Sequence, residues 1–75
     1  MVTVFSKPSC GACVATRRAL DKAGVEYRLV DVSADAEARE MLVSRGFTQM
    51  PVVDPGDDGE WFSGFRPVHI RALFR

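Results

Sequence analysis

Residues 7–20, KPSCGACVATRRAL, decide the fold, because they hold both cysteines of the chain, Cys10 and Cys13. The run VTVF before them, residues 2–5, is rich in β-branched and aromatic side chains and predicts a buried strand. Residues 11–23 contain alanine, arginine, leucine and lysine without proline, and they predict a helix with one apolar face. The cysteines therefore lie where a strand turns into a helix. By themselves they fit a metal clip, a structural staple or a reactive pair.

The predicted start of the helix gives the two cysteines unequal roles. Ser9 is the expected N-cap and Gly24 the expected C-cap, so Cys10 becomes the first helical residue. Cys10 then lies among unpaired backbone N–H groups at the positive end of the helix dipole, which favours its thiolate. Lys7 is expected to add positive potential beside it. Cys13, one turn later, points into the packing face and lies close enough to Cys10 for a disulfide.

This arrangement predicts dithiol–disulfide exchange. Cys10 attacks a substrate disulfide, and Cys13 then attacks Cys10, which releases the reduced substrate and leaves the pair oxidised. A structural zinc site normally needs four Cys or His ligands, and the single histidine, His69, lies far away in the last predicted helix. A purely structural disulfide would close a very small loop and constrain little of the unfolded chain. We therefore expect a reactive pair and no bound metal.

Composition excludes several other functions. The chain has 75 residues and is expected to form one domain, residues 1–75. Its formal net charge is zero and no long run of one sign occurs, which argues against a nucleic-acid or anionic-membrane partner. No membrane span or signal peptide is visible, so a soluble cytoplasmic protein is expected. In a reducing cytosol a two-cysteine pair is catalytic or metal-binding more often than structural.

The rest of the chain predicts the order strand, helix, strand, helix, strand, strand, helix. Ser33 is the expected cap of the second helix, and Pro67 can open the last one. The other expected elements are a strand over residues 25–32, a helix ended by Gly46, a short strand after Pro51, a turn over residues 55–59 and a return strand over residues 60–62. A strand–helix–strand start implies a parallel pair with a right-handed crossover.

This layout resembles the thioredoxin fold, an α/β fold of the order β-α-β-α-β-β-α, with a four-stranded mixed sheet flanked by three helices. KPSCGAC and QMPVV look like two landmarks of its glutaredoxin-sized branch, a C-x-x-C motif after the first strand and a proline before the third. By this resemblance the Met50–Pro51 bond is cis and faces the cysteine pair. Pro51 cannot donate a hydrogen bond, and the Met50 backbone would pair, as a strand does, with a substrate segment.

The third landmark distinguishes two branches of the family. Glutathione-binding glutaredoxins place acidic residues ahead of the last helix to hold the amino end of the tripeptide. This chain has SGFRP there, residues 63–67, with Arg66 at a position where an acidic residue would be needed. SGFRP is similar to the hallmark of NrdH-redoxins, which resemble glutaredoxins in sequence and thioredoxins in behaviour.

The NrdH-redoxin resemblance implies specific partners. Thioredoxin reductase, fed by NADPH, would reduce the protein, which would pass electrons to a class Ib ribonucleotide reductase. It implies a monomer with no cofactor besides the redox-active disulfide. The expected site therefore has Cys10 and Cys13 as catalytic residues. The expected substrate- and partner-binding residues are Lys7, Gly11, Ala12, Met50, Pro51, Ser63, Gly64, Phe65 and Arg66.

Two departures from the NrdH-redoxin pattern remain. That family commonly has Val-Gln or Met-Gln between the cysteines, whereas this chain has Gly11-Ala12. It also usually has tryptophan directly before SGFRP, whereas here Phe62 takes that place after Trp61. Strand alternation predicts that one of these two aromatics packs in the core and the other lies on the surface. A glutathione-dependent glutaredoxin, an iron–sulfur module and a zinc-clipped adaptor remain as alternatives.

Overall fold

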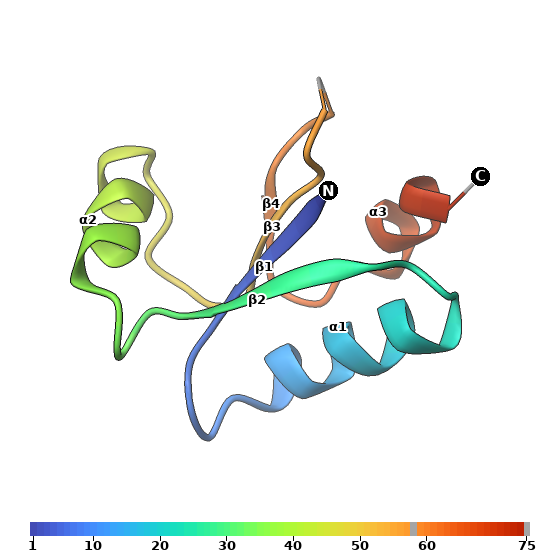
Figure 1. The fold of residues 1–75 in the computed structure, drawn as a ribbon, viewed down its shortest axis with the longest axis horizontal. Coiled ribbons are helices and arrows are strands. Elements are labelled where there is room, and N and C mark those ends of the chain that lie inside the picture. The colour runs from blue at the N-terminus through green and yellow to red at the C-terminus, as the bar shows by residue number, and fades with distance from the viewer. Residues whose placement is uncertain (58, 75) are drawn as a thin grey trace.

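The secondary structure follows the predicted order of strands and helices (Figure 1). A computed structural model describes residues 1–57 and 59–74. Its elements are β1 (Val2–Ser6), α1 (Gly11–Lys22), β2 (Tyr27–Asp31), α2 (Ala36–Ser44), β3 (Val52–Asp54), β4 (Phe62–Ser63) and α3 (Pro67–Arg71), followed by a 3₁₀ turn, Ala72–Phe74. Within the predicted turn over residues 55–59, Asp58 lies outside the described residues.

The four strands form a mixed sheet in the order β2-β1-β3-β4. β1 and β2 are parallel, as the crossover through α1 requires, whereas β3 is antiparallel to both β1 and β4. Val4 lies opposite Val53, and Phe5 lies opposite Val52. Because successive side chains of a strand point to opposite faces, these neighbours supply both faces of the sheet. The predicted thioredoxin fold is confirmed.

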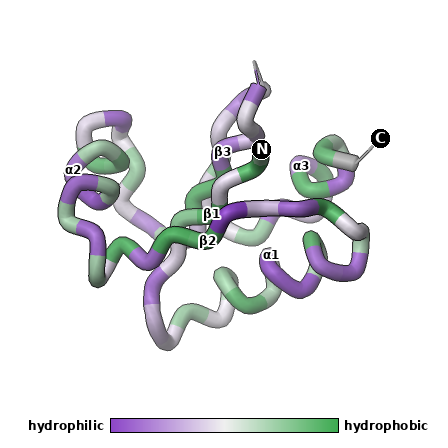
Figure 2. The backbone as a smooth tube through the Cα atoms, in the orientation of Figure 1, coloured by the Kyte–Doolittle hydropathy of each residue, from purple (hydrophilic) through white to green (hydrophobic). Residues whose placement is uncertain are grey.

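Each face of the sheet has its own hydrophobic cluster. On one face, Leu20 of α1 and Ile70 of α3 pack against β1, β3 and β4. On the other face, Leu42 of α2 packs against Phe5 and Val52. Figure 1 shows α1 and α3 on one side of the sheet and α2 on the other, and Figure 2 shows hydrophobic and hydrophilic residues alternating along the helices. Helices with one buried face therefore cover both sides of the sheet.

The positions of Trp61 and Phe62, the aromatic pair before the SGFRP loop, differ in part from the prediction. Phe62 is buried in the cluster beneath α1 and α3, as expected for one member of the pair. Trp61 does not lie free on the surface, because it packs on the opposite face, stacked on Phe5 and Phe47. The Arg45 guanidinium covers the Trp61 ring at 3.8 Å from its centroid. Since both faces of the sheet are covered, alternation buries Phe62 on one face and half-buries Trp61 on the other.

The cap of the second helix lies two residues after the predicted cap. Asp35 is the N-cap, and its carboxylate accepts a hydrogen bond of 3.0 Å from the Ala38 N–H. Ser33 lies in the turn before it and donates from its backbone N–H and its hydroxyl to the Asp31 carboxylate. The prediction of Ser33 as the cap was wrong, because the Asp31 carboxylate engages it. No helix among the described residues is long and apolar enough to cross a membrane.

Candidate active site

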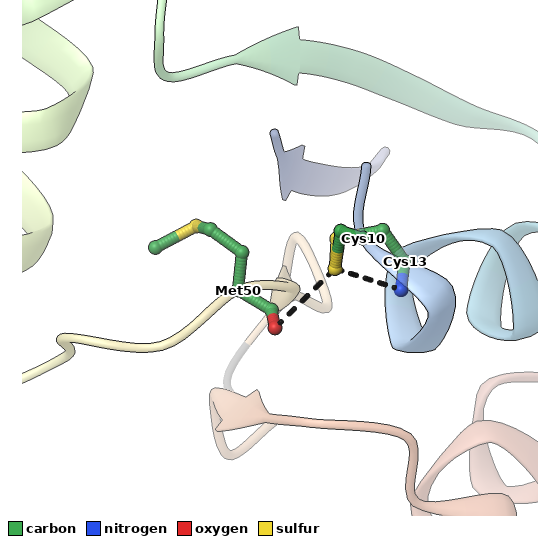
Figure 3. Close-up of a disulfide and its surroundings, with 3 residues drawn as sticks. All are labelled: Cys10, Cys13 and Met50. Atoms are coloured by element: carbon green, nitrogen blue, oxygen red, sulfur yellow. Dashed lines mark hydrogen bonds between the residues drawn. A yellow bond between two sulfur atoms is a disulfide. The ribbon is translucent and has the colours of Figure 1, made fainter. Parts of the chain in front are cut away.

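Cys10 and Cys13 form a disulfide at the start of α1 (Figure 3). Their Cα atoms are 5.2 Å apart, a normal distance for a disulfide. Cys13 is 3% exposed and belongs to the buried face of α1, together with Thr16 and Leu20. Cys10 is half-buried at the helix end. As expected, the two sulfur atoms therefore differ in their access to solvent.

Cys10 itself caps the helix, so the prediction that Ser9 is the cap was wrong. Cys10 has extended backbone angles, φ −114° and ψ 104°, as an N-cap requires. Its Sγ accepts a hydrogen bond of 3.1 Å from the Cys13 N–H. Ser9 has a φ of 58°, in the left-handed region, and is the turn residue before the cap. The cysteine sulfur therefore takes the position that a serine or aspartate oxygen usually holds.

This capping geometry favours negative charge on the Cys10 sulfur once the disulfide is reduced. The Cys13 N–H already points at that sulfur, and the first helical turn, GACV, carries no acidic side chain. Both the free N–H groups and the positive end of the helix dipole stabilise an anion there. The favoured Cys10 thiolate stays a prediction, which now rests on the cap position of the cysteine and not on the first helical position.

The Met50–Pro51 bond is cis, as the resemblance implied, and it faces the disulfide. The Met50 carbonyl oxygen lies 3.7 Å from the Cys10 sulfur and points toward it in Figure 3. A disulfide sulfur has no hydrogen, so this contact can become a hydrogen bond only when Cys10 is a thiol. Pro51 is fully buried and directly precedes β3, which begins at Val52.

The loop over residues 63–66 is attached directly to this proline. The Gly64 N–H donates a hydrogen bond of 2.9 Å to the Pro51 carbonyl. Gly64 has a φ of 82°, a conformation that other residues rarely adopt. The Arg66 side chain closes the loop, because its Nε–H donates to the Ser63 carbonyl at 3.0 Å. Phe65 stays 45% exposed.

The other predicted contact residues surround the disulfide less tightly. Gly11 is exposed, and a Cβ built on it would meet no atom within 4 Å. Ala12 is half-buried beside it. Lys7 is exposed and lines a cavity of about 230 Å³ together with Met50. The Cys10 sulfur thus contacts the Met50 carbonyl, and the SGFRP loop contacts the next residue, Pro51. Lys7 and Met50 line the same cavity.

Two features of the site were missed by sequence reasoning. One is the capping sulfur, because serine at position 9 offers the stronger conventional signal. The other is the bond between Gly64 and Pro51, which extends the pairing of β3 with β4 beyond the predicted return strand. Among the residues that the structure describes, no three His, Cys, Asp or Glu side chains are grouped closely enough to hold a metal ion.

A disulfide at the start of the first helix of a thioredoxin fold, facing a cis-proline, defines a thiol–disulfide oxidoreductase. The comparisons agree with this class. The family model described as Glutaredoxin matches residues 2–58. The glutaredoxin-like protein NrdH of Escherichia coli K12 is 39% identical over 72 residues, covering 96% of this chain and 86% of that protein.

Two further comparisons give the same family. NrdH of Lactococcus lactis subsp. cremoris is 32% identical over 73 residues, covering 97% of this chain and 99% of that one. The solved structure of NrdH-redoxin from Escherichia coli superposes with a TM-score of 0.90 at 39% identity, covering 96% of this chain and 92% of that chain. The chain belongs to the glutaredoxin family, and within it to the NrdH-redoxins.

Proposed function

We propose that this protein carries electrons from thioredoxin reductase to a class Ib ribonucleotide reductase. The observation that carries the proposal is the loop over residues 63–66, fastened to Pro51 and bearing Arg66 beside the site. Glutathione presents a cationic amino group, which an acidic residue would hold at this place. The Arg66 guanidinium repels such a group.

Cys10 is the nucleophile in the proposed reaction. Its thiolate attacks one sulfur of the client disulfide, the client S–S bond breaks, and the second client sulfur leaves as a thiolate that takes up a proton. The Cys13 thiolate then attacks the Cys10 sulfur of the mixed disulfide. A Cys10–Cys13 bond forms, the bond to the client breaks, and the client leaves with two thiols. The reductase then reduces the Cys10–Cys13 bond with two electrons from NADPH, and the proposed reaction needs no other cofactor on this protein.

Burial supports this order of events. The half-buried Cys10 is the sulfur that a client can reach, whereas Cys13 at 3% exposure is reached only from within the protein. The polypeptide of the client lies along the Met50 backbone, where Pro51 has no N–H to offer. Phe65, exposed on the loop beside Pro51, contacts the partner, and Lys7, Gly11 and Ala12 complete the rim around the sulfur.

One relative supports a thioredoxin-like role for this protein. The solved Escherichia coli homologue is a glutaredoxin-like protein with a thioredoxin-like activity profile. We place the reaction in the cytoplasm, where reductase and ribonucleotide reductase operate in a reducing environment. The proposed working form is a monomer.

The test is a turnover assay that measures NADPH oxidation with a class Ib ribonucleotide reductase as the client. We expect turnover with thioredoxin reductase, and at most a few per cent of that rate with glutathione and glutathione reductase. Activity only with glutathione would overturn the proposal. If thioredoxin reductase supports reduction of a model disulfide but not of the ribonucleotide reductase, the proposed electron donor would stand and the proposed client would be wrong.

A charge reversal sharpens this test. Arg66→Asp should raise the glutathione-dependent rate and lower the reductase-dependent rate. Arg71→Asp is the matched control, because Arg71 is also exposed and lies in α3, near the loop. Equal effects of the two substitutions would mean that only overall charge matters, and the assigned role of Arg66 would be wrong.

A further inference from the structure

A hydroxyl on the buried face of α1, one turn after Cys13, has no hydrogen-bond partner among the described residues. Thr16 is 0% exposed and belongs to the buried face of α1, between Cys13 and Leu20. Among the residues that the structure describes, its Oγ1 is the one buried side-chain oxygen or nitrogen with no partner. Leaving a buried hydroxyl unpaired costs about 1–3 kcal/mol. An apolar side chain would avoid this cost, so the threonine needs an explanation.

The usual partner of a helical threonine is the carbonyl four residues earlier. That carbonyl belongs to Ala12, and Thr16 does not donate to it in this oxidised structure. The hydroxyl is therefore free to bond to a group that becomes available only in another state of the protein. The reduced state provides such a group, a free cysteine sulfur.

Cys13 is the neighbour that changes on reduction. Thr16 follows Cys13 by three residues, a spacing that brings the Cβ atoms of a helix to about 5–6 Å from each other. Helical side chains lean toward the N-terminus, so the Thr16 hydroxyl leans toward the turn that holds Cys13. In the oxidised form the Cys13 sulfur is bonded to Cys10 and does not accept from Thr16. Reduction frees that sulfur.

We propose that Thr16 is a positioning residue that hydrogen-bonds the Cys13 sulfur in the reduced protein. When an incoming thiolate attacks Cys10, the Cys10–Cys13 bond breaks and its electron pair stays on Cys13 as a thiolate. The Thr16 hydroxyl donates to this thiolate, or accepts from the thiol once Cys13 is protonated. Thr16 exchanges no atoms. It stabilises the reduced form relative to the oxidised one, and it holds the buried sulfur ready to attack the mixed disulfide.

This inference rests on dithiol exchange by the cysteine pair and on no particular client or electron donor. It makes a signed prediction for the redox equilibrium. A hydrogen bond present only in the reduced form raises the reduction potential, and its removal lowers that potential. Removal of the hydroxyl should instead increase the free energy of unfolding of the oxidised form, because a buried unpaired hydroxyl is lost.

The experiment equilibrates the protein with mixtures of reduced and oxidised dithiothreitol and measures the fraction of oxidised protein. We expect Thr16→Val to shift the equilibrium constant about tenfold toward the oxidised protein, which is about 30 mV at this two-electron couple. Thr16→Ser keeps the hydroxyl and should stay within about twofold of the wild type. Thr3→Val, a threonine of β1 that is only partly buried, is the control and should leave the equilibrium unchanged.

Urea unfolding of both redox forms separates this role from a purely structural one. The oxidised Thr16→Val protein should be at least as stable as the wild type, and the reduced protein less stable. Equal loss of stability in both forms with an unchanged equilibrium would show a helix bond to the Ala12 carbonyl and would overturn the proposal. A Ser variant that shifts as far as the Val variant would also overturn it. If Thr16→Val does not fold, Thr16→Ala removes the same hydroxyl without adding bulk.

Discussion

The chemistry of this protein depends on one residue that serves as helix cap and nucleophile. Cys10 accepts the Cys13 N–H with the same sulfur that we propose attacks the client. Oxygen caps stabilise helices by about 1 kcal/mol, and a thiolate in the cap position would gain both that hydrogen bond and the helix dipole. Protein stability and reactivity therefore share one contact.

The two cysteines should respond differently to serine substitution. Cys10→Ser should abolish disulfide reduction, because the accessible sulfur is lost. Cys13→Ser should still attack but should remain joined to its client, because the resolving sulfur is missing. Non-reducing mass spectrometry after incubation with a disulfide-bonded client detects that adduct. Full turnover by Cys13→Ser on protein disulfides would contradict the two-thiol mechanism.

Gly11 is the residue between the cysteines that can be changed at least risk. It is the first residue of α1, its φ is not positive, and no atom lies within 4 Å of a built Cβ. We expect Gly11→Ala to raise the free energy of unfolding by about 0.4–1 kcal/mol, since alanine loses less backbone freedom on folding. Urea unfolding measures the change. Gly64→Ala is the opposing control, because its φ of 82° should make that substitution destabilising.

Sequence reasoning found both cysteines but misassigned two caps, for one physical reason. Each helix is preceded by two candidate caps close together, Ser9 beside Cys10 and Ser33 near Asp35. Propensity favours serine over cysteine in the first pair and does not separate the second. Backbone conformation decides both cases, since the cap residue must be extended and the preceding residue must make the turn. That conformation depends on where the strand ends, which the pattern locates only to within a few residues.

At the scale of elements, the connection between β2 and α2 is held by a carboxylate. Asp31 accepts from the Ser33 hydroxyl at 2.6 Å and from the Ser33 N–H at 2.9 Å. Both bonds lower the pKa of Asp31 from its ordinary value of 3.8, and the bond from the hydroxyl has the larger effect. A depressed pKa means that this contribution to stability is present above the unfolded pKa and is lost as the pH falls through the folded pKa.

Ser33→Ala should therefore raise the pKa of Asp31 toward its ordinary value, because the larger of the two bonds is removed. NMR titration of the Asp31 carboxyl carbon measures the shift. Ser44→Ala is the matched control, since the Ser44 hydroxyl donates to the Met41 carbonyl and not to Asp31. If the titration of Asp31 does not move, the backbone N–H alone sets it. The loss of stability on acidification should also become smaller in Ser33→Ala.

The turn after β3 lies in close contact with Met1, the residue before β1. Gly56 has a φ of 80°, and a Cβ there would lie 2.6 Å from the Met1 carbonyl carbon. Gly24 has a similar φ of 74°, but no atom lies within 4 Å of its built Cβ. Alanine in this conformation costs about 1–2 kcal/mol at either glycine. Gly56→Ala should cost at least about 1 kcal/mol more, because the backbone of Met1 must also shift. Urea unfolding of both variants measures the difference, and equal losses would contradict the close packing.

The C-terminal hairpin was the least predictable element. The return strand was expected over residues 60–62, whereas β4 is Phe62–Ser63. Only two residues pair with β3, so the turn can take up a shift of a residue or two at little cost in hydrogen bonds. The ladder continues beyond β4 through the bond from the Gly64 N–H to the Pro51 carbonyl. The register of such a hairpin depends on the length and geometry of its turn, about which the propensities of single residues contain little information.

At the scale of the whole molecule, a small protein divides its core between two faces of one sheet. The sequence predicted a buried strand over residues 2–5, but it could not predict that Trp61 packs between Phe5 and Phe47 under Arg45. Arg45 is the C-cap of α2 and Phe47 follows two residues later, so the packing depends on how α2 docks. A protein of 75 residues has a stability of roughly 4–11 kcal/mol. Neither cluster is expected to stay folded without the other, so we predict that the two unfold together.

Leucine truncation on each face tests this. Leu20 and Leu42 are both 0% exposed, one in each cluster, and Leu20→Ala or Leu42→Ala should each cost about 2–5 kcal/mol. Val14→Ala and Val43→Ala are the controls on the same two helices, because these valines are 46% and 58% exposed. Each control should change stability by less than about 0.5 kcal/mol.

Two probes decide whether the clusters are coupled. The single tryptophan, Trp61, reports by fluorescence on the face covered by α2, whereas far-UV circular dichroism reports on the whole chain. If the protein is cooperative, both probes give one urea midpoint in each variant, and Leu20→Ala moves the Trp61 transition although Leu20 lies on the opposite face. A Trp61 midpoint that shifts in Leu42→Ala but not in Leu20→Ala would mean that the α2 face unfolds independently. The cavity beside Met50 would then open while α1 stays folded, because Leu42 and Met50 belong to the same cluster and line that cavity.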